Sequence, residues 1–364
     1  MRVALVAGET SGDLLGAGLI NAIRSSQPDA TFEGVAGPEM QAAGCECIEH
    51  AEVLAVMGLI EPLARIPRLL RLRKSLIRRW IENPPDVFVG IDAPDFNLGL
   101  ESRLKSAGVP TVHYVCPSVW AWRQGRVAKI AAAVDKVLCL LPFERAFLVN
   151  HGIAADFVGH PLADRLPIQP DIEGARRSLG LAGRQVVAVL PGSRMSEVSR
   201  LGPVFVAAAK RIEAARADVE FVAPMVSAEI RQHFTRVLEK AGCERFTLTD
   251  GDAETAISAA DVVLLASGTA TLQAALLGKP MVVAYRLAGI SYAITQAFDL
   301  VKVPYVSLPN LLTEDPHVPE FIQGAATPEP LADAVLELLD DSARRELITG
   351  AFASLRESLA CDAD

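Results

Sequence analysis

Short runs of β-forming residues alternate with helical patterns along the whole chain, an arrangement typical of parallel sheets with crossover helices. The runs form two series, and each series opens with an apolar strand that leads through a glycine-containing loop into a helix. The first series predicts strands at 3–7, 32–35, 87–91, 111–115, 137–140 and 157–158. The second predicts strands at 186–190, 220–223, 246–248, 262–266 and 281–284. The expected fold is therefore α/β, with two facing, doubly wound, Rossmann-like domains and a cleft between them.

The length of the chain suits this division. Its 364 residues correspond to two domains of common size. We expect the first domain at 1–160, followed by a linker that carries three prolines and ends at Pro170. The second domain is expected at 171–329. Amphipathic helices at 330–364 should pack back against the body of the protein.

Composition and patterning disfavour several classes of protein. No apolar run approaches the ~20 residues of a membrane-spanning helix, and the apolar strand before Gly8 is too short for a signal peptide. We therefore expect a cytoplasmic protein. A net charge of −9 argues against nucleic-acid binding. The six cysteines are scattered without C-x-x-C spacing; we expect them to be small buried hydrophobes, and we expect neither a metal nor a cofactor.

The loop after the first strand, Gly8 to Asp13, is not a familiar nucleotide fingerprint. It lacks the lysine of a P-loop, and its glycines do not give G-x-G-x-x-G, so a dinucleotide dehydrogenase is disfavoured. The loop nevertheless puts Glu9 and Ser11 at the carboxyl end of a strand, where ligands of open α/β sheets bind. The alternative for Ser11 and Asp13 is helix capping.

The second half contains a more favourable phosphate site. Ser267-Gly268-Thr269 follows a predicted strand and opens a helix, so free backbone N–H groups and the helix dipole would favour an anion there. Arg194 follows the predicted strand at 186–190 and could add a bidentate cationic contact to a diphosphate. Each feature alone could be an ordinary helix start. Together they favour an anion site.

Five segments in register resemble one family. They are Ala7-Gly8-Glu9-Thr10-Ser11-Gly12-Asp13, Gly90-Ile91-Asp92-Ala93-Pro94-Asp95-Phe96-Asn97, Pro117-Ser118-Val119-Trp120-Ala121-Trp122-Arg123, Leu190-Pro191-Gly192-Ser193-Arg194 and Val306-Ser307-Leu308-Pro309-Asn310-Leu311-Leu312. In this order, over nearly the whole chain, they closely resemble bacterial lipid-A-disaccharide synthases. The resemblance implies a GT-B glycosyltransferase that joins UDP-2,3-diacylglucosamine to 2,3-diacylglucosamine 1-phosphate (lipid X), with inversion. UDP and a β-1,6 disaccharide would be the products.

The resemblance also implies where the substrates bind. The C-terminal half would hold the nucleotide and the N-terminal half the acceptor. The residues expected at the donor are Gly192, Ser193, Arg194, Ser267, Gly268, Thr269, Gln273 and Asn310. Position 273 is often Glu in such enzymes, so the uncharged Gln273 is a departure, although it can still hydrogen-bond a ribose hydroxyl. Ser11, Trp120 and Trp122 are expected at the acceptor or the membrane.

Inverting transfer needs a base for the acceptor hydroxyl and positive charge or N–H dipoles for the departing diphosphate. Asp92 ends a predicted strand in the acceptor half and is the expected base. The alternative is a cap for the helix after Pro94, a place that Asp95 suits better. Glu9 and His113 are the other residues considered for the base, and Glu9 is retained as a second catalytic candidate.

A basic stretch between Arg65 and Trp80 runs against the acidic balance of the chain. On a helix, Arg68, Arg71, Lys74, Arg78 and Arg79 share one arc, whereas Leu69, Leu70, Leu76, Ile77 and Trp80 share the opposite arc. Such a helix suits an anionic membrane surface. The alternative is an ordinary helix with a solvated charged face. Met57, Leu59 and Ile60 could lead acyl chains towards the site or could be core residues. We expect a peripheral protein on the inner face of the inner membrane.

Two other functions fit the fold class. A UDP-N-acetylglucosamine 2-epimerase also has two Rossmann-like halves, but has no need of the basic helix or of the Trp120–Trp122 pair. A two-domain solute-binding protein would need an export signal. The chain ends at Asp364, where the resembling enzymes usually continue through another helix. Whether the C-terminus is truncated and whether a homodimer forms through that helix both stay open.

Overall fold

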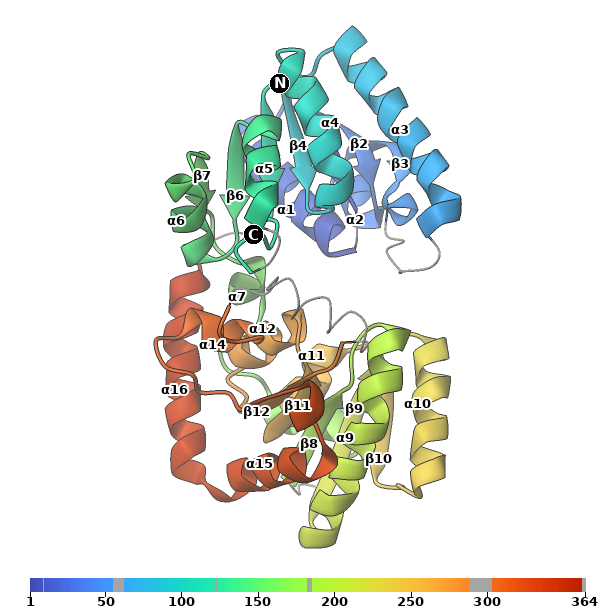
Figure 1. Ribbon diagram of the computed structural model, residues 1–364, viewed down its shortest axis with the longest axis vertical. Coiled ribbons are helices and arrows are strands. Elements are labelled where there is room, and N and C mark those ends of the chain that lie inside the picture. The colour runs from blue at the N-terminus through green and yellow to red at the C-terminus, as the bar shows by residue number, and fades with distance from the viewer. Residues whose placement is uncertain (9, 55–61, 122–123, 182–184, 288–302, 362–364) are drawn as a thin grey trace. The chain divides into compact units, whose positions relative to one another are not determined.

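The structure is a computed structural model and describes residues 1–8, 10–54, 62–121, 124–181, 185–287 and 303–361 (Figure 1). Two compact units are present. Unit 1 comprises Met1–Arg165 and Leu359–Asp364, and unit 2 comprises Leu166–Asp299 and Val303–Ser358. The chain leaves unit 1 after a short helix, α7 (Pro161–Arg165).

Unit 1 is built on a parallel sheet with the strand order β3-β2-β1-β4-β5-β6-β7. Its strands are β1 (Arg2–Ala7), β2 (Thr31–Ala36), β3 (Cys45–His50), β4 (Val87–Ile91), β5 (Thr111–Tyr114), β6 (Lys136–Cys139) and β7 (Ala155–Phe157). Its other helices are α1 (Thr10–Ser26), α2 (Pro38–Ala42), α3 (Pro62–Glu82), α4 (Pro94–Ser106), α5 (Val127–Ala133) and α6 (Pro142–Asn150). Short 3-10 turns η1 (Ala51–Val53) and η2 (Gln124–Arg126) complete the unit.

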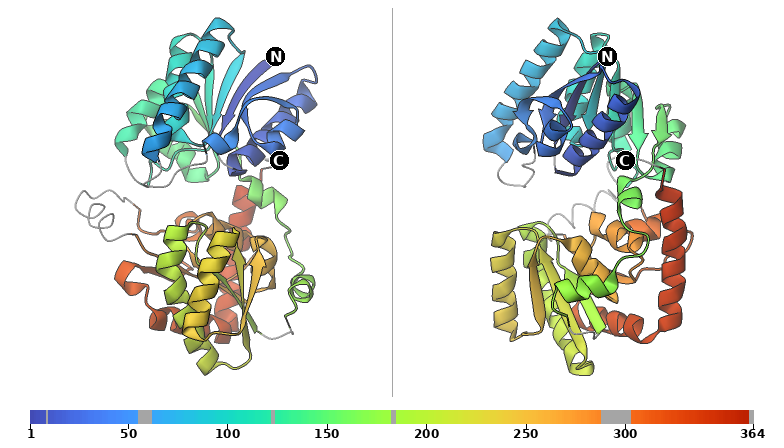
Figure 2. Two further views of the ribbon diagram at one scale, coloured as in Figure 1. Left: turned by 90° about the vertical axis from the view of Figure 1, so that its right-hand side faces the viewer. Right: turned by 180° about the vertical axis from the view of Figure 1, so that it is seen from behind.

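The alternation of side chains along β1 decides which helices cover each face of this sheet. Leu5 and its neighbours two residues away pack with Ile20 of α1 and Met40 of α2. Val6 packs on the other face with Trp80 of α3 and Leu100 of α4. Helices therefore cover both faces, as Figure 2 shows from two sides. A parallel sheet requires this covering, because both of its faces are apolar.

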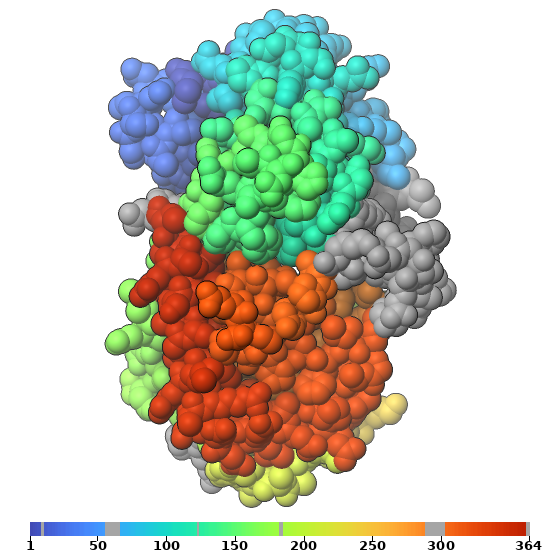
Figure 3. Space-filling view, turned by 60° about the vertical axis from the view of Figure 1, so that its left-hand side comes forward, coloured from blue at the N-terminus to red at the C-terminus, as the bar shows by residue number. Residues whose placement is uncertain are grey.

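Unit 2 repeats the architecture with the parallel order β10-β9-β8-β11-β12-β13. The strands are β8 (Gln185–Leu190), β9 (Val219–Met225), β10 (Phe246–Asp250), β11 (Val262–Ala266), β12 (Met281–Tyr285) and β13 (Glu320–Ile322). The helices are α8 (Ile172–Ser178), α9 (Met195–Ala215), α10 (Ala228–Ala241), α11 (Ala253–Ala259), α12 (Thr269–Leu276), α14 (Leu308–Leu312), α15 (Pro328–Asp340) and α16 (Ser342–Leu359), with the 3-10 turn η3 (Gln323–Ala325). Segments after residue 303 form much of the surface of unit 2 that Figure 3 displays.

The predicted fold class is confirmed, since both sheets are parallel and doubly wound. Each strand predicted from the sequence lies in one of them. The sequence did not predict β3 or β13, which lie at the outer edges. Edge strands are partly solvated and often polar, and Cys45–His50 has a mostly half-buried, charged pattern that lacks the apolar run of an inner strand.

Each sheet has a topological switch point where ligands of open α/β folds bind. In unit 1 it lies between β1 and β4, whose register pairs Ala7 with Ile91. In unit 2 it lies between β8 and β11, whose register pairs Leu190 with Leu265. The loops after these four strands carry most of the residues expected to act on the substrates. Among the described residues, no helix has both the length and the apolar character needed to cross a membrane.

Candidate functional site

The switch point of unit 1 has an unusual backbone. Asp92 and Ala93, directly after β4, have φ angles of 49° and 44°. Left-handed conformations cost a residue other than glycine about 1–2 kcal/mol, and such strain persists where the surrounding structure enforces it, commonly at functional sites. A Cβ atom added at Gly8 would lie 2.5 Å from Cβ of Ala93. The loops after β1 and β4 therefore touch.

Asp92 does not cap the helix that follows it. Helix α4 has Ala93 at its N-cap position, with no side-chain hydrogen bond there. The expectation that Asp95 suits the cap better is also wrong, because the Asp95 carboxylate pairs with Arg126 at 2.6 Å. Within the described part of the chain, no side chain or backbone group hydrogen-bonds the Asp92 carboxylate. Asp92 is half-buried.

His113 and Glu9 are the two other residues considered for the general base. His113 is fully buried, and its Nδ1 lies 2.7 Å from Oε1 of Glu101, which is also fully buried. Burial raises the pKa of Glu101, and the adjacent His113 offsets this rise only in part. A general base must reach the hydroxyl that it deprotonates, and the described residues cover His113. Glu9 lies outside the described residues.

Asp13 and Ser11 of the first loop could each cap a helix or face a ligand, and the structure places them differently. Asp13 is buried, and its carboxylate accepts hydrogen bonds from the backbone N–H groups of Gly37, Glu39 and Met40 at 2.9–3.0 Å. It therefore caps α2, a helix distant in sequence, and has a structural role. Ser11, in contrast, is exposed on the first turn of α1.

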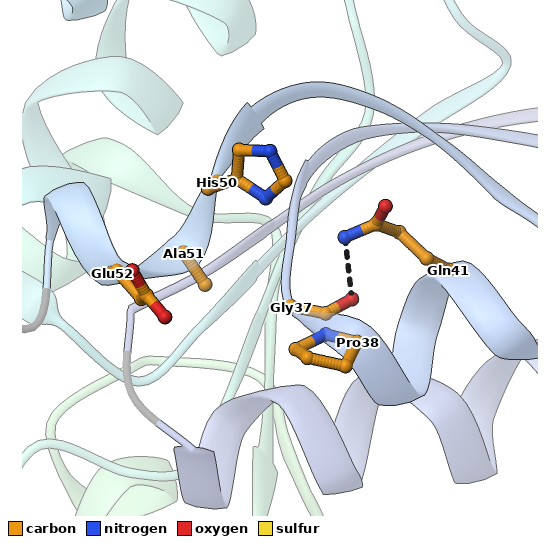
Figure 4. Close-up of a pocket in the computed structure, with 6 residues that line it drawn as sticks. All are labelled: Gly37, Pro38, Gln41, His50, Ala51 and Glu52. Atoms are coloured by element: carbon orange, nitrogen blue, oxygen red, sulfur yellow. Dashed lines mark hydrogen bonds between the residues drawn. The ribbon is translucent and has the colours of Figure 1, made fainter.

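A cavity of about 490 Å³ lies at the carboxyl ends of β2 and β3. Figure 4 shows its walls: Gly37, Pro38 and Gln41 come from α2 and the residue before it, and His50, Ala51 and Glu52 from the end of β3 and the 3-10 turn after it. The Gln41 amide donates a hydrogen bond to the Gly37 carbonyl at 3.1 Å. The cavity thus offers an imidazole, an amide and a carboxylate beside apolar proline and alanine surface.

In unit 2, Arg194 occupies the N-cap position of α9 and is exposed. Its side chain forms no ion pair with any described carboxylate. The adjacent backbone donors are already engaged, because Glu197 accepts hydrogen bonds from the N–H groups of Ser193 and Arg194 at 3.1 and 3.3 Å. Gly192, with a φ angle of 124°, lets the backbone of this loop approach the Glu197 carboxylate closely. The exposed Arg194 guanidinium is therefore the donor of this loop that has no carboxylate partner among the described residues.

The neighbouring loop after β11 opens α12. Gly268 and Thr269 are exposed at its first turn, and Gln273 is half-buried one turn further on. The Ser267 hydroxyl donates to the Val306 carbonyl at 2.6 Å and so holds a third loop against this helix start. These residues and Arg194 follow adjacent strands, as the sequence predicted.

Asn310 does not present its amide to a ligand in this structure. Its Nδ2 donates to the Val318 carbonyl and to Oε1 of Glu320, and its Oδ1 accepts from the Val318 N–H, all at 2.8–2.9 Å. Glu320 also accepts from the N–H groups of Val306 and Ser307 at 2.8 and 3.0 Å. Sequence reasoning missed Glu320, because nothing in its local pattern shows that a loop 13 residues earlier folds onto it.

Trp120 is half-buried in unit 1. Its Nε1 donates to Oε1 of Glu144 at 3.0 Å, and its ring packs edge-on against Phe143. Burial raises the pKa of Glu144 to about 7. Four of the six cysteines are buried as expected, whereas Cys47 is half-buried and Cys361 is exposed, so the prediction is wrong for Cys361. Cys116 and Cys139 lie beside Glu144, and the sulfur and carboxylate atoms of these three residues lie within 4.8 Å of one another. Trp122 lies outside the described residues.

Helix α3 confirms most of the predicted helical arcs. Leu76 and Trp80 are buried in the core of unit 1, and Leu69 and Ile77 pack at its margin. Leu70 is an error in the predicted apolar arc, because it is 49% exposed. The buried face of the helix is narrower than the predicted apolar arc and does not include Leu70.

The basic arc of α3 divides into cations that pair with a carboxylate and cations without such a partner among the described residues. Arg68 lies 3.7 Å from Glu49, and Arg79 lies 2.7 Å from Glu33. Burial alone would raise the pKa of Glu33, but hydrogen bonds from Arg79 and Trp80 lower it. The remaining basic residues of the arc, Arg71, Lys74 and Arg78, are exposed and form no ion pair with a described carboxylate. Met57, Leu59 and Ile60 lie outside the described residues.

Solved structures with the same architecture include glycosyltransferases and epimerases. A UDP-GlcNAc 2-epimerase from Neisseria meningitidis, solved with UDP-GlcNAc, matches with a TM-score of 0.64 at 11% identity and covers 99% of each chain. MurG from Acinetobacter baumannii matches with a TM-score of 0.56 at 15% identity, covering 98% of this chain and 94% of that one. At such low identity these likenesses show the GT-B fold alone.

Sequence comparison distinguishes between these classes. A family model described as lipid-A-disaccharide synthetase matches residues 3–363. A lipid-A-disaccharide synthase from Alkalilimnicola ehrlichii is 52% identical over 368 residues, covering 100% of this chain and 96% of the relative. One from Pseudomonas aeruginosa is 52% identical over 365 residues with the same coverage. The predicted resemblance is confirmed: this chain belongs to the lipid-A-disaccharide synthase family and is a glycosyltransferase.

Proposed function

We propose that the enzyme transfers the sugar of UDP-2,3-diacylglucosamine to 2,3-diacylglucosamine 1-phosphate, with inversion, to form a β-1,6-linked disaccharide and UDP. The full-length family match carries this proposal. The two switch points support it, because one bears a carboxylate without a described partner and the other bears an exposed guanidinium beside a helix start.

In the proposed reaction, the Asp92 carboxylate takes the proton of the acceptor hydroxyl. That oxygen forms a bond to the anomeric carbon as the bond to the diphosphate breaks, and UDP departs with the electron pair. By removing this proton, the base makes the acceptor oxygen a stronger nucleophile. Arg194 and the first turn of α12 stabilise the negative charge that develops on the leaving group.

The binding roles follow from the same arrangement. We assign UDP to unit 2, with Gly268, Thr269 and Gln273 near it. Asn310 has no free donor, so its proposed role is to hold the loop that Ser267 also holds. The acceptor is assigned to the carboxyl edge of unit 1. His50, Gln41 and Glu52 there have the groups that hydrogen-bond sugar hydroxyls.

A membrane role is proposed for α3. The proposed acceptor is a lipid, and the exposed basic residues Arg71, Lys74 and Arg78 lie on the helix that also exposes Ile66 and Leu70. Basic residues beside exposed apolar side chains are typical of interfacial helices. We propose that this face binds the anionic cytoplasmic leaflet of the inner membrane.

The direct test is incubation of the protein with UDP-2,3-diacylglucosamine, with and without lipid X. We expect UDP and disaccharide only when both substrates are present, and a β linkage by NMR. Release of UDP without the disaccharide would contradict transfer to this acceptor. Conversion of UDP-N-acetylglucosamine to its C2 epimer would instead support the epimerase alternative.

A further inference from the structure

Two consecutive left-handed residues after β4 need something to hold them. Asp92 and Ala93 are not glycines, and Ala93 precedes Pro94, whose ring further restricts the conformation of the residue before it. Left to itself, this segment would relax to ordinary backbone angles and move the Asp92 carboxylate. A neighbouring group must therefore compensate for the strain.

Asn97 is placed to do this. Its Nδ2 donates to the Asp92 carbonyl at 2.8 Å and lies 3.2 Å from the Val6 carbonyl and 3.4 Å from the Ile91 carbonyl. Its own backbone N–H donates to the Ala93 carbonyl at 3.0 Å. The Asn97 side chain therefore holds Asp92 and links it to the ends of β1 and β4, and the backbone bond to Ala93 is the first helical hydrogen bond of α4.

The packing around Asn97 leaves its side chain little freedom. Asn97 and Glu101 lie one helical turn apart on α4, and both are fully buried. A Cβ atom added at Gly90 would lie 3.0 Å from Cβ of Asn97 and 2.2 Å from Oε1 of Glu101. Both side chains thus pack tightly against the backbone of β4 at Gly90. Glu101 is in turn held by its contact with the buried His113 of β5.

The hydrogen bonding of the Asn97 amide is one-sided. Among the described residues, its Oδ1 is buried without a hydrogen-bond partner. A buried acceptor without a partner destabilises a fold, so an apolar side chain of similar size would suit the core better. The amide is explained by its N–H donors, which bind the Asp92 carbonyl and the carbonyls of Val6 and Ile91 at the ends of β1 and β4.

We propose that Asn97 is a positioning residue that holds the strained Asp92–Ala93 segment and so aims the Asp92 carboxylate at the acceptor hydroxyl. This inference rests on the proposed role of Asp92 as the general base. Asn97 touches no substrate. Its loss should lower kcat while leaving the KM for lipid X and the affinity for UDP nearly unchanged.

The test compares Asn97→Ala, Asp92→Asn and the double variant. A general base contributes about 10²–10⁴-fold, which is the ceiling for a residue acting through it, and we expect Asn97→Ala to lower kcat by about 10- to 100-fold. In the Asp92→Asn background the same change should cost less than about threefold, because no base remains to be aimed. Asn150→Ala, at an exposed asparagine of the same unit, should leave kcat unchanged.

The outcomes separate the two proposals. If Asp92→Asn loses turnover but Asn97→Ala keeps it, the positioning role falls and the base stands. If Asp92→Asn keeps its turnover, both fall. Equal losses from Asn97→Ala in both backgrounds, or a joint loss of UDP affinity and melting temperature, would show a merely structural asparagine. Should Asn97→Ala not fold, Asn97→Ser keeps one donor and should retain more activity than Asn97→Asp, which keeps the shape but loses both amide hydrogens.

Discussion

Three aspartates around the carboxyl edge of unit 1 show how surroundings decide what one side chain does. Asp13 is buried under three backbone N–H groups and stabilises α2. Asp95 is exposed and paired with Arg126, an arrangement that contributes little to stability. Asp92 has no hydrogen-bonding partner among the described residues and stands on strained backbone. Of the three, only Asp92 combines access with a fixed position, which is what a general base needs.

Replacing Asp92 with Asn should lower turnover by about 10²–10⁴-fold, the usual contribution of general-base catalysis. Asn keeps the size of the side chain but cannot take the proton. Steady-state turnover with both substrates would measure this, and calorimetry should show nearly unchanged UDP affinity, because the donor is assigned to unit 2. Turnover close to that of the wild type would reject the base, and Glu9→Gln would be the next variant.

Arg194→Ala should weaken UDP binding by about 1.5–3 kcal/mol, the range for hydrogen bonds to charged groups. The guanidinium is the group that its loop keeps free, since Glu197 occupies the nearby N–H groups. Calorimetric titration with UDP measures the change. Arg236→Ala, on α10 of the same unit, is the matched control and should bind UDP normally. Unchanged affinity in a folded Arg194→Ala would remove this residue from the donor site.

At the scale of elements, α3 has two chemically different faces. Its inner stripe, with Leu76 and Trp80, belongs to the core of unit 1. Its outer face carries cations of two kinds: Arg68 and Arg79 are paired with glutamates, whereas three others lack such partners. The buried inner stripe agrees with both interpretations of α3, a membrane-binding helix and an ordinary helix with a solvated charged face. The two interpretations differ in the role of the outer face.

Changing Arg71, Lys74 and Arg78 to Ser should weaken binding to vesicles that contain anionic lipid. Each basic residue near such a surface contributes about 1 kcal/mol, so the partition constant should fall by up to about 100-fold and become less sensitive to salt. Co-sedimentation measures this. A variant of unit 2 with Arg177, Arg236 and Lys240 changed to Ser has the same net charge and should bind like the wild type. Equal binding by all three proteins would support an ordinary solvated face.

At the scale of the whole molecule, each unit is a complete doubly wound domain with its own switch point, and the chain closes unit 1 only at its end. The backbone N–H of His160 donates to the Leu359 carbonyl at 2.9 Å. The ring of His160 accepts a hydrogen bond at Nδ1 from the Leu162 N–H at 3.2 Å. Residues on either side of unit 2 in the sequence therefore complete one domain.

His160 should make stability depend on pH. Burial lowers its pKa from 6.5 to about 4, so the folded state resists a proton that the unfolded state takes up. The stability that the neutral ring contributes is present above pH 6.5 and is lost as the pH falls towards 4. The upper limit of the loss is about 3 kcal/mol, at about 1.4 kcal/mol per pKa unit.

Urea unfolding at several values of pH would measure this effect. His160→Asn keeps an acceptor for the Leu162 N–H but does not titrate, so its stability should fall less between pH 6.5 and 5. His151→Asn, at an exposed histidine, should follow the wild type. Parallel pH curves for wild type and His160→Asn would show that the ring of His160 is not the cause.

Much of this organisation is encoded locally and can be read from the sequence. Inner strands such as β8 and β11 are continuous apolar runs, because a parallel sheet is buried on both faces. Their ends are marked by glycine and polar residues, so the positions of Asp92, Arg194 and Ser267 at strand ends were predictable. The family could be recognised for the same reason, since its motifs lie in these loops.

Long-range contacts decided the rest. Asp13 proved to be a cap only because α2 begins beside it, 24 residues away. Asn310 was expected at the donor, yet Val318 and Glu320 bind its amide, and no periodicity shows which partner a buried amide will find. The edge strands β3 and β13 and the left-handed turn at Asp92 likewise depend on neighbours. A pattern of residues can show where a strand ends, but which polar groups meet there depends on how the backbone brings distant segments together.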